Sequence, residues 1–189
     1  MQLQPARKMR AVTEPGDSTR YIVGVDLGQS VDSTAISVLE HTTRRRIANG
    51  REPGKMTRTD TYACRHLERL PLGMSYVQQA ARIRSLMYTA PLRGNAKLVV
   101  DETGVGKAVT DIIRDQGLHP VTVSITGGEE ETETQTGFRV PKLQLVSRLQ
   151  AMLHNGDLRI AQGQPEAEAL KAELQDFQVS YSANTGHAR

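Results

Sequence analysis

The sequence predicts an α/β domain whose mixed β-sheet combines antiparallel hairpin strands with parallel strands and is flanked by helices. Two patterns predict this fold: short β-branched runs come first, and an alternation of strands and helices follows. The composition agrees, because 189 residues with 38% hydrophobic side chains, two Phe, five Tyr and no Trp must build an aliphatic core. The length is typical of one domain.

The first three strands are predicted at the beginning of the chain. Residues 21–26 (YIVGVD) and 34–39 (TAISVL) are apolar runs joined by a Gly/Ser/Asp turn, which is typical of a hairpin. A third strand is expected over 59–66, after a long basic stretch. Residues 1–20 are polar and contain Pro and Gly, so we expect a flexible arm or linker remnant there.

Alternating helices and strands are predicted next. Apolar residues recur at helical spacing over 75–88, which predicts a crossover helix. A buried strand over 97–100 should lead into Asp101, followed by a helix over 105–116 and a strand over 121–125. This order favours a sheet with parallel members.

The last third of the sequence combines a loop with two helices. The acidic, glycine-containing segment 126–137 has no regular periodicity, and we expect a mobile loop. Pro141 should open an amphipathic helix that ends at Asn155-Gly156, a good stop signal. A further helix is expected from near Pro165 to about Asp176.

Composition limits the classes of function. The net charge of +3 and the pI near 9.2 favour binding of polyanions only where the charge is clustered. The single Cys64 excludes an internal disulfide and a cysteine-rich zinc site, as expected for a reducing cytosol. The first twenty residues lack the apolar stretch of a signal peptide, and no later segment resembles a membrane span.

Two acids are candidates for chemistry because each ends a predicted strand. Asp26 and Asp101 should emerge at one edge of the sheet if their strands are neighbours and parallel. Two converging carboxylates without a basic partner repel each other, and a shared Mg²⁺ or Mn²⁺ would keep both ionised. Either Asp alone would more commonly be a turn former or a helix cap; the two together favour a metal site.

Two neighbouring acids are supporting candidates. Asp32 lies on the far side of the turn after Asp26 and would shape that turn. Glu102 should point away from Asp101 if the strand continues through it.

Three segments resemble the nuclease domain of phage terminase large subunits. They are YIVGVDLGQSVDSTAISVLE (21–40), KLVVDETGVGKAVTDIIRDQGLHPVTVSITGG (97–128) and FRVPKLQLVSRLQAMLHNGDLRIA (138–161). The segments resemble, in order, that family's first hairpin, its second acidic strand with the following helix, and its next helix. The resemblance runs from about Tyr21 to the end of the sequence, and its second segment is the most specific.

The resemblance implies a ribonuclease H-like nuclease domain over 21–189 and cleavage of double-stranded DNA with two Mg²⁺ or Mn²⁺ ions, which such sites hold about 3.5–4 Å apart. It implies that Asp26 bridges the metals and that Asp101 binds one of them. It also implies a cytoplasmic location in a bacterial host, and a terminase ATPase domain, a small terminase subunit and a portal as partners.

The sequence departs from the family at its end. A third acid is expected on a helix after a Gly-His-containing segment, and the sequence stops at Thr185-Gly186-His187-Ala188-Arg189, so the domain is expected to be truncated there. The upstream packaging ATPase is not in this sequence either.

Basic residues are candidate DNA contacts. A basic loop beside a cleft would hold phosphates without reading bases, although such runs are more commonly solvated loops. Lys107 is a candidate because it follows glycines at a helix start; an exposed helix lysine is an equal alternative. A Walker phosphate loop is excluded, because Asp101 stands where its first glycine belongs. The candidates are Arg44, Arg45, Arg46, Arg51, Lys55, Arg58 and Lys107.

Three rival functions are compatible with the same patterns. Asp26-Leu27-Gly28-Gln29-Ser30 also resembles the phosphate turn of actin-like ATPases, which need a second phosphate hairpin and about twice this length. A Holliday-junction resolvase is closer in size but would lack the same third acid. A non-catalytic DNA-binding or assembly module of terminase origin is the rival from another class.

Overall fold

The computed structural model describes residues 16–28, 31–47, 56–104, 106–161 and 163–176. In chain order the elements are β1 (Ser18–Asp26), β2 (Ala35–Ile47), β3 (Met56–Arg69), α1 (Tyr76–Met87), β4 (Ala96–Asp101), α2 (Gly106–Asp115), β5 (Val121–Thr126), β6 (Thr132–Glu133), β7 (Gly137–Pro141), α3 (Lys142–His154), β8 (Leu158–Ile160) and α4 (Ala167–Asp176).

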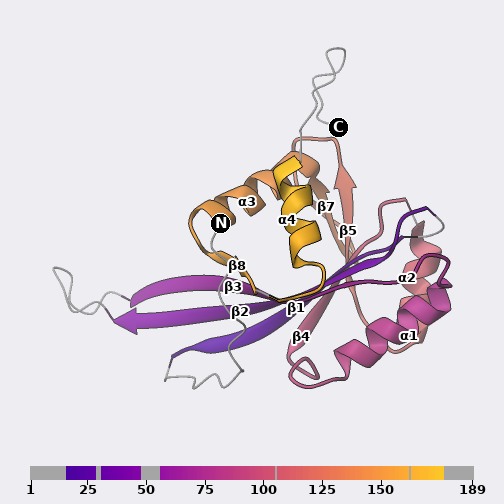
Figure 1. Cartoon of the computed structure of the whole chain (residues 1–189), viewed down its shortest axis with the longest axis horizontal. Helices are drawn as coiled ribbons and strands as arrows, with labels where there is room; N and C mark the ends of the chain where they lie inside the picture. The colour runs from indigo at the N-terminus through magenta and orange to yellow at the C-terminus, as the bar shows by residue number, and fades with distance from the viewer. Residues whose placement is uncertain (1–15, 29–30, 48–55, 105, 162, 177–189) are drawn as a thin grey trace, which may run out of the picture.

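The strands form one sheet in the order β6-β7-β5-β4-β1-β2-β3-β8. β2 runs antiparallel to both β1 and β3, whereas β1, β4, β5 and β7 run parallel to their neighbours in that series. Each parallel connection crosses over through a helix or a longer segment, as parallel pairing requires. The predicted mixed sheet is thus confirmed (Figure 1).

The main core lies between the sheet and the helices α1 and α2. Val23 and Val100 on the central strands and Ile83 and Ile113 on the two helices are at most 1% exposed. Because side chains alternate along a strand, the residues next to Val23 on β1 and next to Val100 on β4 point to the other face of the sheet. Burial of this aliphatic layer fixes which face of β1 and β4 remains available for a site.

A smaller apolar cluster lies on the opposite face, where α4 packs. Cys64 of β3, Ile160 of β8 and Ala167 of α4 are its buried members. Burial raises the pKa of the Cys64 thiol to about 11, so this thiol stays protonated at neutral pH and is not a nucleophile. Figure 1 shows α3 and α4 on one side of the sheet, away from α1 and α2.

Several predicted helix boundaries are confirmed. Ser75 caps α1 through a capping box with Gln78, in agreement with a predicted start at residue 75. Pro141 is the N-cap residue of α3, and the helix ends before Asn155. No helix among the described ranges combines the length and the apolar character needed to cross a membrane.

Other boundaries were wrong. The loop expected over 126–137 contains β6, which pairs with β7, and the parallel strands β7 and β8 were missed. β7 has five residues and β8 three, too few for a periodic pattern, and pairing with longer strands stabilises them. Ser18–Arg20, expected in the flexible arm, begin β1; residues 1–15 lie outside the described part.

Candidate metal-binding site

Asp26 and Asp101 are direct neighbours across two parallel strands. Each is the last residue of its strand, β1 or β4, and the two are register partners. Register partners in a parallel pair point to the same face, and their backbones lie about 4.8 Å apart. The structure thus brings both carboxylates to one edge and one face of the sheet, as the sequence prediction required.

The electrostatics of this pair favour a bound cation. Although the Asp26 side chain reaches the surface, partial desolvation raises its pKa, and the negative charges of Asp101 and then Asp32 raise it further. None of the ion pairs found in the described part of the chain involves Asp26 or Asp101. Two carboxylates that repel each other and lack a cationic partner form a donor set suited to a hard divalent ion.

The turn after β4 orients Asp101. One of its carboxylate oxygens accepts a hydrogen bond of 2.8 Å from the backbone N–H of Thr103. The Thr103 hydroxyl in turn accepts a bond of 2.7 Å from the N–H of Ile125. The carboxylate is therefore tied to the edge of β5, and its other oxygen has no hydrogen bond among the described residues.

A protein-family model described as a terminase RNaseH-like domain matches residues 23–188, which include both acids and most of the elements described above. The chain belongs to this family. No curated protein matches the chain. This match confirms the resemblance to the terminase nuclease domain and the expected ribonuclease H-like fold.

The turn after Asp26 in this terminase domain is held by buried polar side chains. The Gly28 N–H donates to the Thr34 hydroxyl at 3.0 Å, and that hydroxyl donates to the Gln79 amide oxygen at 2.8 Å. The Gln79 amide nitrogen donates to the carbonyl oxygens of Gly28 and Met74. Thr34 and Gln79 are 2% and 3% exposed, so α1 anchors the turn that carries Asp26.

Replacing Gln79 with leucine is expected to lower the free energy of unfolding by about 2 kcal/mol, because buried carbonyl and hydroxyl groups lose their partners. The unfolding temperature should fall by about 4–8 °C, measured by calorimetry in EDTA. Gln150→Leu is the matched control, since Gln150 is exposed on α3 and should shift it by less than about 2 °C. Equal shifts in both variants would show that Gln79 does not anchor the turn.

The two supporting acids are placed differently. Asp32 is exposed, and its charge reaches Asp26. β4 ends at Asp101 and does not continue through Glu102. Glu102 accepts a hydrogen bond from the Ser124 hydroxyl at 3.2 Å, and Ser124 follows the register partner of Asp101, so Glu102 turns away from Asp101. The described residues contain no group of three or more acidic, His or Cys side chains that could hold a metal.

The four arginine candidates that the structure describes lie in strands far from the acid pair, so the expected loop beside a cleft was wrong for them. Arg44, Arg45 and Arg46 are part of β2, and Arg58 is part of β3. Arg45 is ten residues along β2 from Ala35, the register partner of Asp26, which corresponds to about 33 Å. Figure 1 shows β2 and β3 extending together away from the rest of the sheet.

Ion pairs already engage part of this basic hairpin. The Arg46 guanidinium contacts Asp17 at 2.7 Å, Arg44 lies 3.9 Å from the same carboxylate, and Arg58 contacts Asp60 at 2.7 Å. Arg51 and Lys55 lie outside the described residues. Lys107 is the second residue of α2, and its side chain also lies outside the described part.

Thr34 and Gln79 position the site but were not among the residues predicted from the sequence. Gln79 immediately precedes Ala80, the first buried apolar residue of α1. A polar residue beside the apolar stripe of an amphipathic helix was the available signal. Its partners, Gly28 and Thr34, lie far away in the sequence and could not be identified from the helix alone.

Proposed function

We propose that this terminase domain is a metal-dependent DNA endonuclease that cuts concatemeric phage DNA during genome packaging. The observation that carries the proposal is the register pairing of Asp26 with Asp101 in a chain of the terminase RNaseH-like family. Mg²⁺ or Mn²⁺ is the proposed cofactor, because nucleases of this fold usually use divalent metals and carboxylate oxygens are their preferred ligands.

The reaction class is hydrolysis of a phosphodiester bond. Water forms the new P–O bond, the bond to the leaving oxygen breaks, and that oxygen takes up a proton. Bound divalent ions would lower the pKa of the attacking water and stabilise charge on the leaving oxygen. The protein's contribution is positional: Asp26 and Asp101 would hold the ions, and the Thr103 N–H keeps one oxygen of Asp101 in place.

The partners follow from the proposed role. Double-stranded DNA is the substrate, and the terminase ATPase domain, the small terminase subunit and the portal would be met in the cytoplasm of a bacterial host. We expect no sequence-specific readout, because contacts to phosphates carry no information about the base sequence.

The second candidate function is a DNA-binding or assembly module without cleavage. It is favoured by one observation: the described residues bring together two acids and no third ligand. The family resemblance leads to a further acid after the segment Thr185–Arg189, and this segment lies outside the described residues.

A plasmid assay separates the two functions. With Mn²⁺ or Mg²⁺, the nuclease should convert supercoiled plasmid into nicked and linear forms, and EDTA should stop the reaction. Retention of the plasmid in a gel without any cut, at every metal concentration, would support the binding module and contradict the nuclease.

A further inference from the structure

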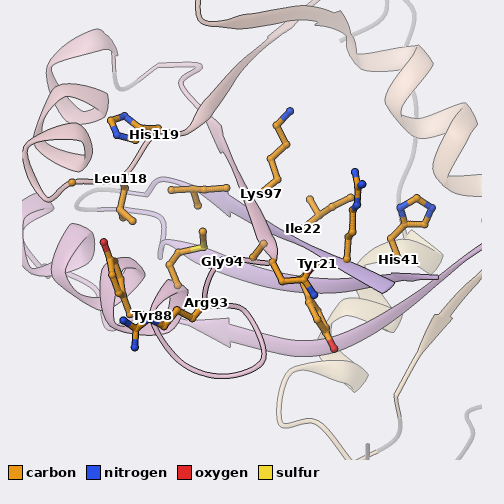
Figure 2. Close-up of a pocket in the computed structure, with 15 residues that line it drawn as sticks. Tyr21, Ile22, His41, Tyr88, Arg93, Gly94, Lys97, Leu118 and His119 are labelled. Carbon is orange, nitrogen blue, oxygen red and sulfur yellow. The ribbon is translucent and has the colours of Figure 1, made fainter. Parts of the chain in front are cut away.

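A basic hollow lies at the end of the sheet where β1 and β4 begin. It has a volume of about 990 Å³ and is formed by residues 20–22 of β1, the first residues of β4, His41 of β2, the loop after α1 and the turn after α2. In the view of Figure 2, Lys97 lies between His119 and His41, and Arg93 and Tyr88 lie at another part of its wall. The acid pair is at the other end of the same strands.

Basic side chains line this hollow, and its described lining brings no carboxylate beside them. Arg20, Arg93, Lys97 and His119 are all exposed, and none takes part in a side-chain hydrogen bond or an ion pair within the described ranges. Its described lining contains no Asp or Glu. A concave surface with unpaired positive charge attracts polyanions and concentrates them locally.

Arginines of the hairpin formed by β2 and β3 differ from the basic residues of the hollow because they have carboxylate partners. Arg44, Arg46 and Arg58 each lie within 4 Å of a carboxylate, so part of their charge is neutralised within the protein. The cations of the hollow would instead gain their first charged partners from a ligand. A phosphate diester offers an acceptor for each guanidinium and ammonium group.

The position of the hollow suits the substrate of a nuclease. Lys97 is paired with Ile22, and Arg20 is two residues before Ile22, so alternation places both on the face of the acid pair. Lys97 is four residues before Asp101 and Arg20 six before Asp26, distances of about 13 and 20 Å along the strands. Both distances are shorter than one turn of B-DNA, about 34 Å. A single duplex could therefore reach the hollow and the acid pair together.

We propose that the basic hollow formed by Arg20, Arg93, Lys97 and His119 is a DNA-backbone site, which binds phosphates of a duplex independently of its sequence and apart from the acid pair. The choice of DNA as the ligand rests on the proposed function, whereas the binding itself requires no cleavage and no metal. Its contacts are to phosphates alone, so it would fix the position of the duplex and carry no base specificity.

Fluorescence anisotropy with a short labelled duplex in EDTA tests the site. The triple variant Arg20→Gln, Arg93→Gln, Lys97→Gln is expected to bind at least about tenfold more weakly than the unaltered chain. The slope of log affinity against log salt should become less steep by about 3, one for each lost phosphate contact. Two unrelated duplex sequences should be affected equally.

A second triple variant controls for net charge. Arg114→Gln, Arg148→Gln and Lys171→Gln remove the same charge from residues that are already ion-paired on α2, α3 and α4, and should change the salt slope by less than about 1. Unfolding temperatures of the hollow variant should stay within about 2 °C, since its side chains are exposed. An unchanged affinity and salt slope in the folded hollow variant would overturn the proposal, whether or not the chain cuts DNA.

Discussion

Replacing either Asp26 or Asp101 with asparagine is expected to lower the rate of Mn²⁺-dependent plasmid nicking by at least about 100-fold. The amide has nearly the shape of the carboxylate but carries no charge, so the site loses one of the two groups that can hold a divalent ion. Metal ions contribute several kcal/mol of transition-state stabilisation, and about 1.4 kcal/mol corresponds to a tenfold change in rate.

The effects of the two substitutions on the nicking rate should not be additive. Because the register pair acts as one ligand set, the double variant is expected to be about as inactive as either single variant. Glu102→Gln provides the matched control: Glu102 is bonded to Ser124 on the other face, and its substitution should change the nicking rate less than about threefold.

Stability measurements distinguish loss of the site from loss of the fold. The raised pKa of Asp26 means that the folded state disfavours its ionised form, so in EDTA this carboxylate costs stability as the pH rises through that pKa. Asp26→Asn should therefore unfold at the same temperature or about 1 °C higher at neutral pH, a small gain because the side chain is solvent-screened. Mg²⁺ should stabilise the unaltered chain but not the variant.

If nicking persists at the original rate in both single variants, Asp26 and Asp101 are not part of the catalytic site. A loss of nicking that coincides with a fall of several degrees in unfolding temperature would point to a structural role instead. The combination of lost cleavage and retained stability is what a metal site requires.

The central sheet could be predicted because its signals are local. Val23, Val25, Leu98 and Val100 form short buried runs, and each run leads to an Asp at its end. β2, β3 and α1 lie between β1 and β4 in the chain, so the pairing of β1 with β4 was a condition of the prediction and did not follow from either run. Given that pairing, the rule that open α/β sheets place their sites at the carboxyl ends of the strands brings Asp26 and Asp101 together.

Features that depend on pairing between distant residues could not be predicted in this way. Three-residue β8 exists because Leu158–Ile160 pair with β3, and nothing within that segment indicates a strand. The basic segment after residue 44 was expected to be a loop because charged residues are uncommon in buried strands. β2 and β3 pair beyond the sheet's other strands, where both faces can be solvated, so arginines are tolerated there.

The substitution Gly28→Ala is expected to lower the free energy of unfolding by about 3 kcal/mol or more. A Cβ atom at this position would overlap the Asp32 carbonyl oxygen and lie 2.6 Å from the carbonyl carbon of Ser33. Both atoms belong to the backbone, so no side-chain rotation relieves the overlap and the turn itself must move. The unfolding temperature should fall by about 6–12 °C, measured by calorimetry.

The same substitution should impair the site, because Gly28 is two residues after Asp26 and is bonded through its N–H and its carbonyl oxygen to Thr34 and Gln79. A turn that moves to accommodate the methyl group lengthens these bonds and releases Asp26 from its anchor on α1. Gly128→Ala is the control, because a Cβ there would make only an ordinary contact of 3.7 Å with the Thr126 hydroxyl, and its effect should stay within about 0.5 kcal/mol. If both variants unfold at the temperature of the unaltered chain, Gly28 does not pack closely against the turn. The proposed anchoring of Asp26 by α1 would then also be wrong.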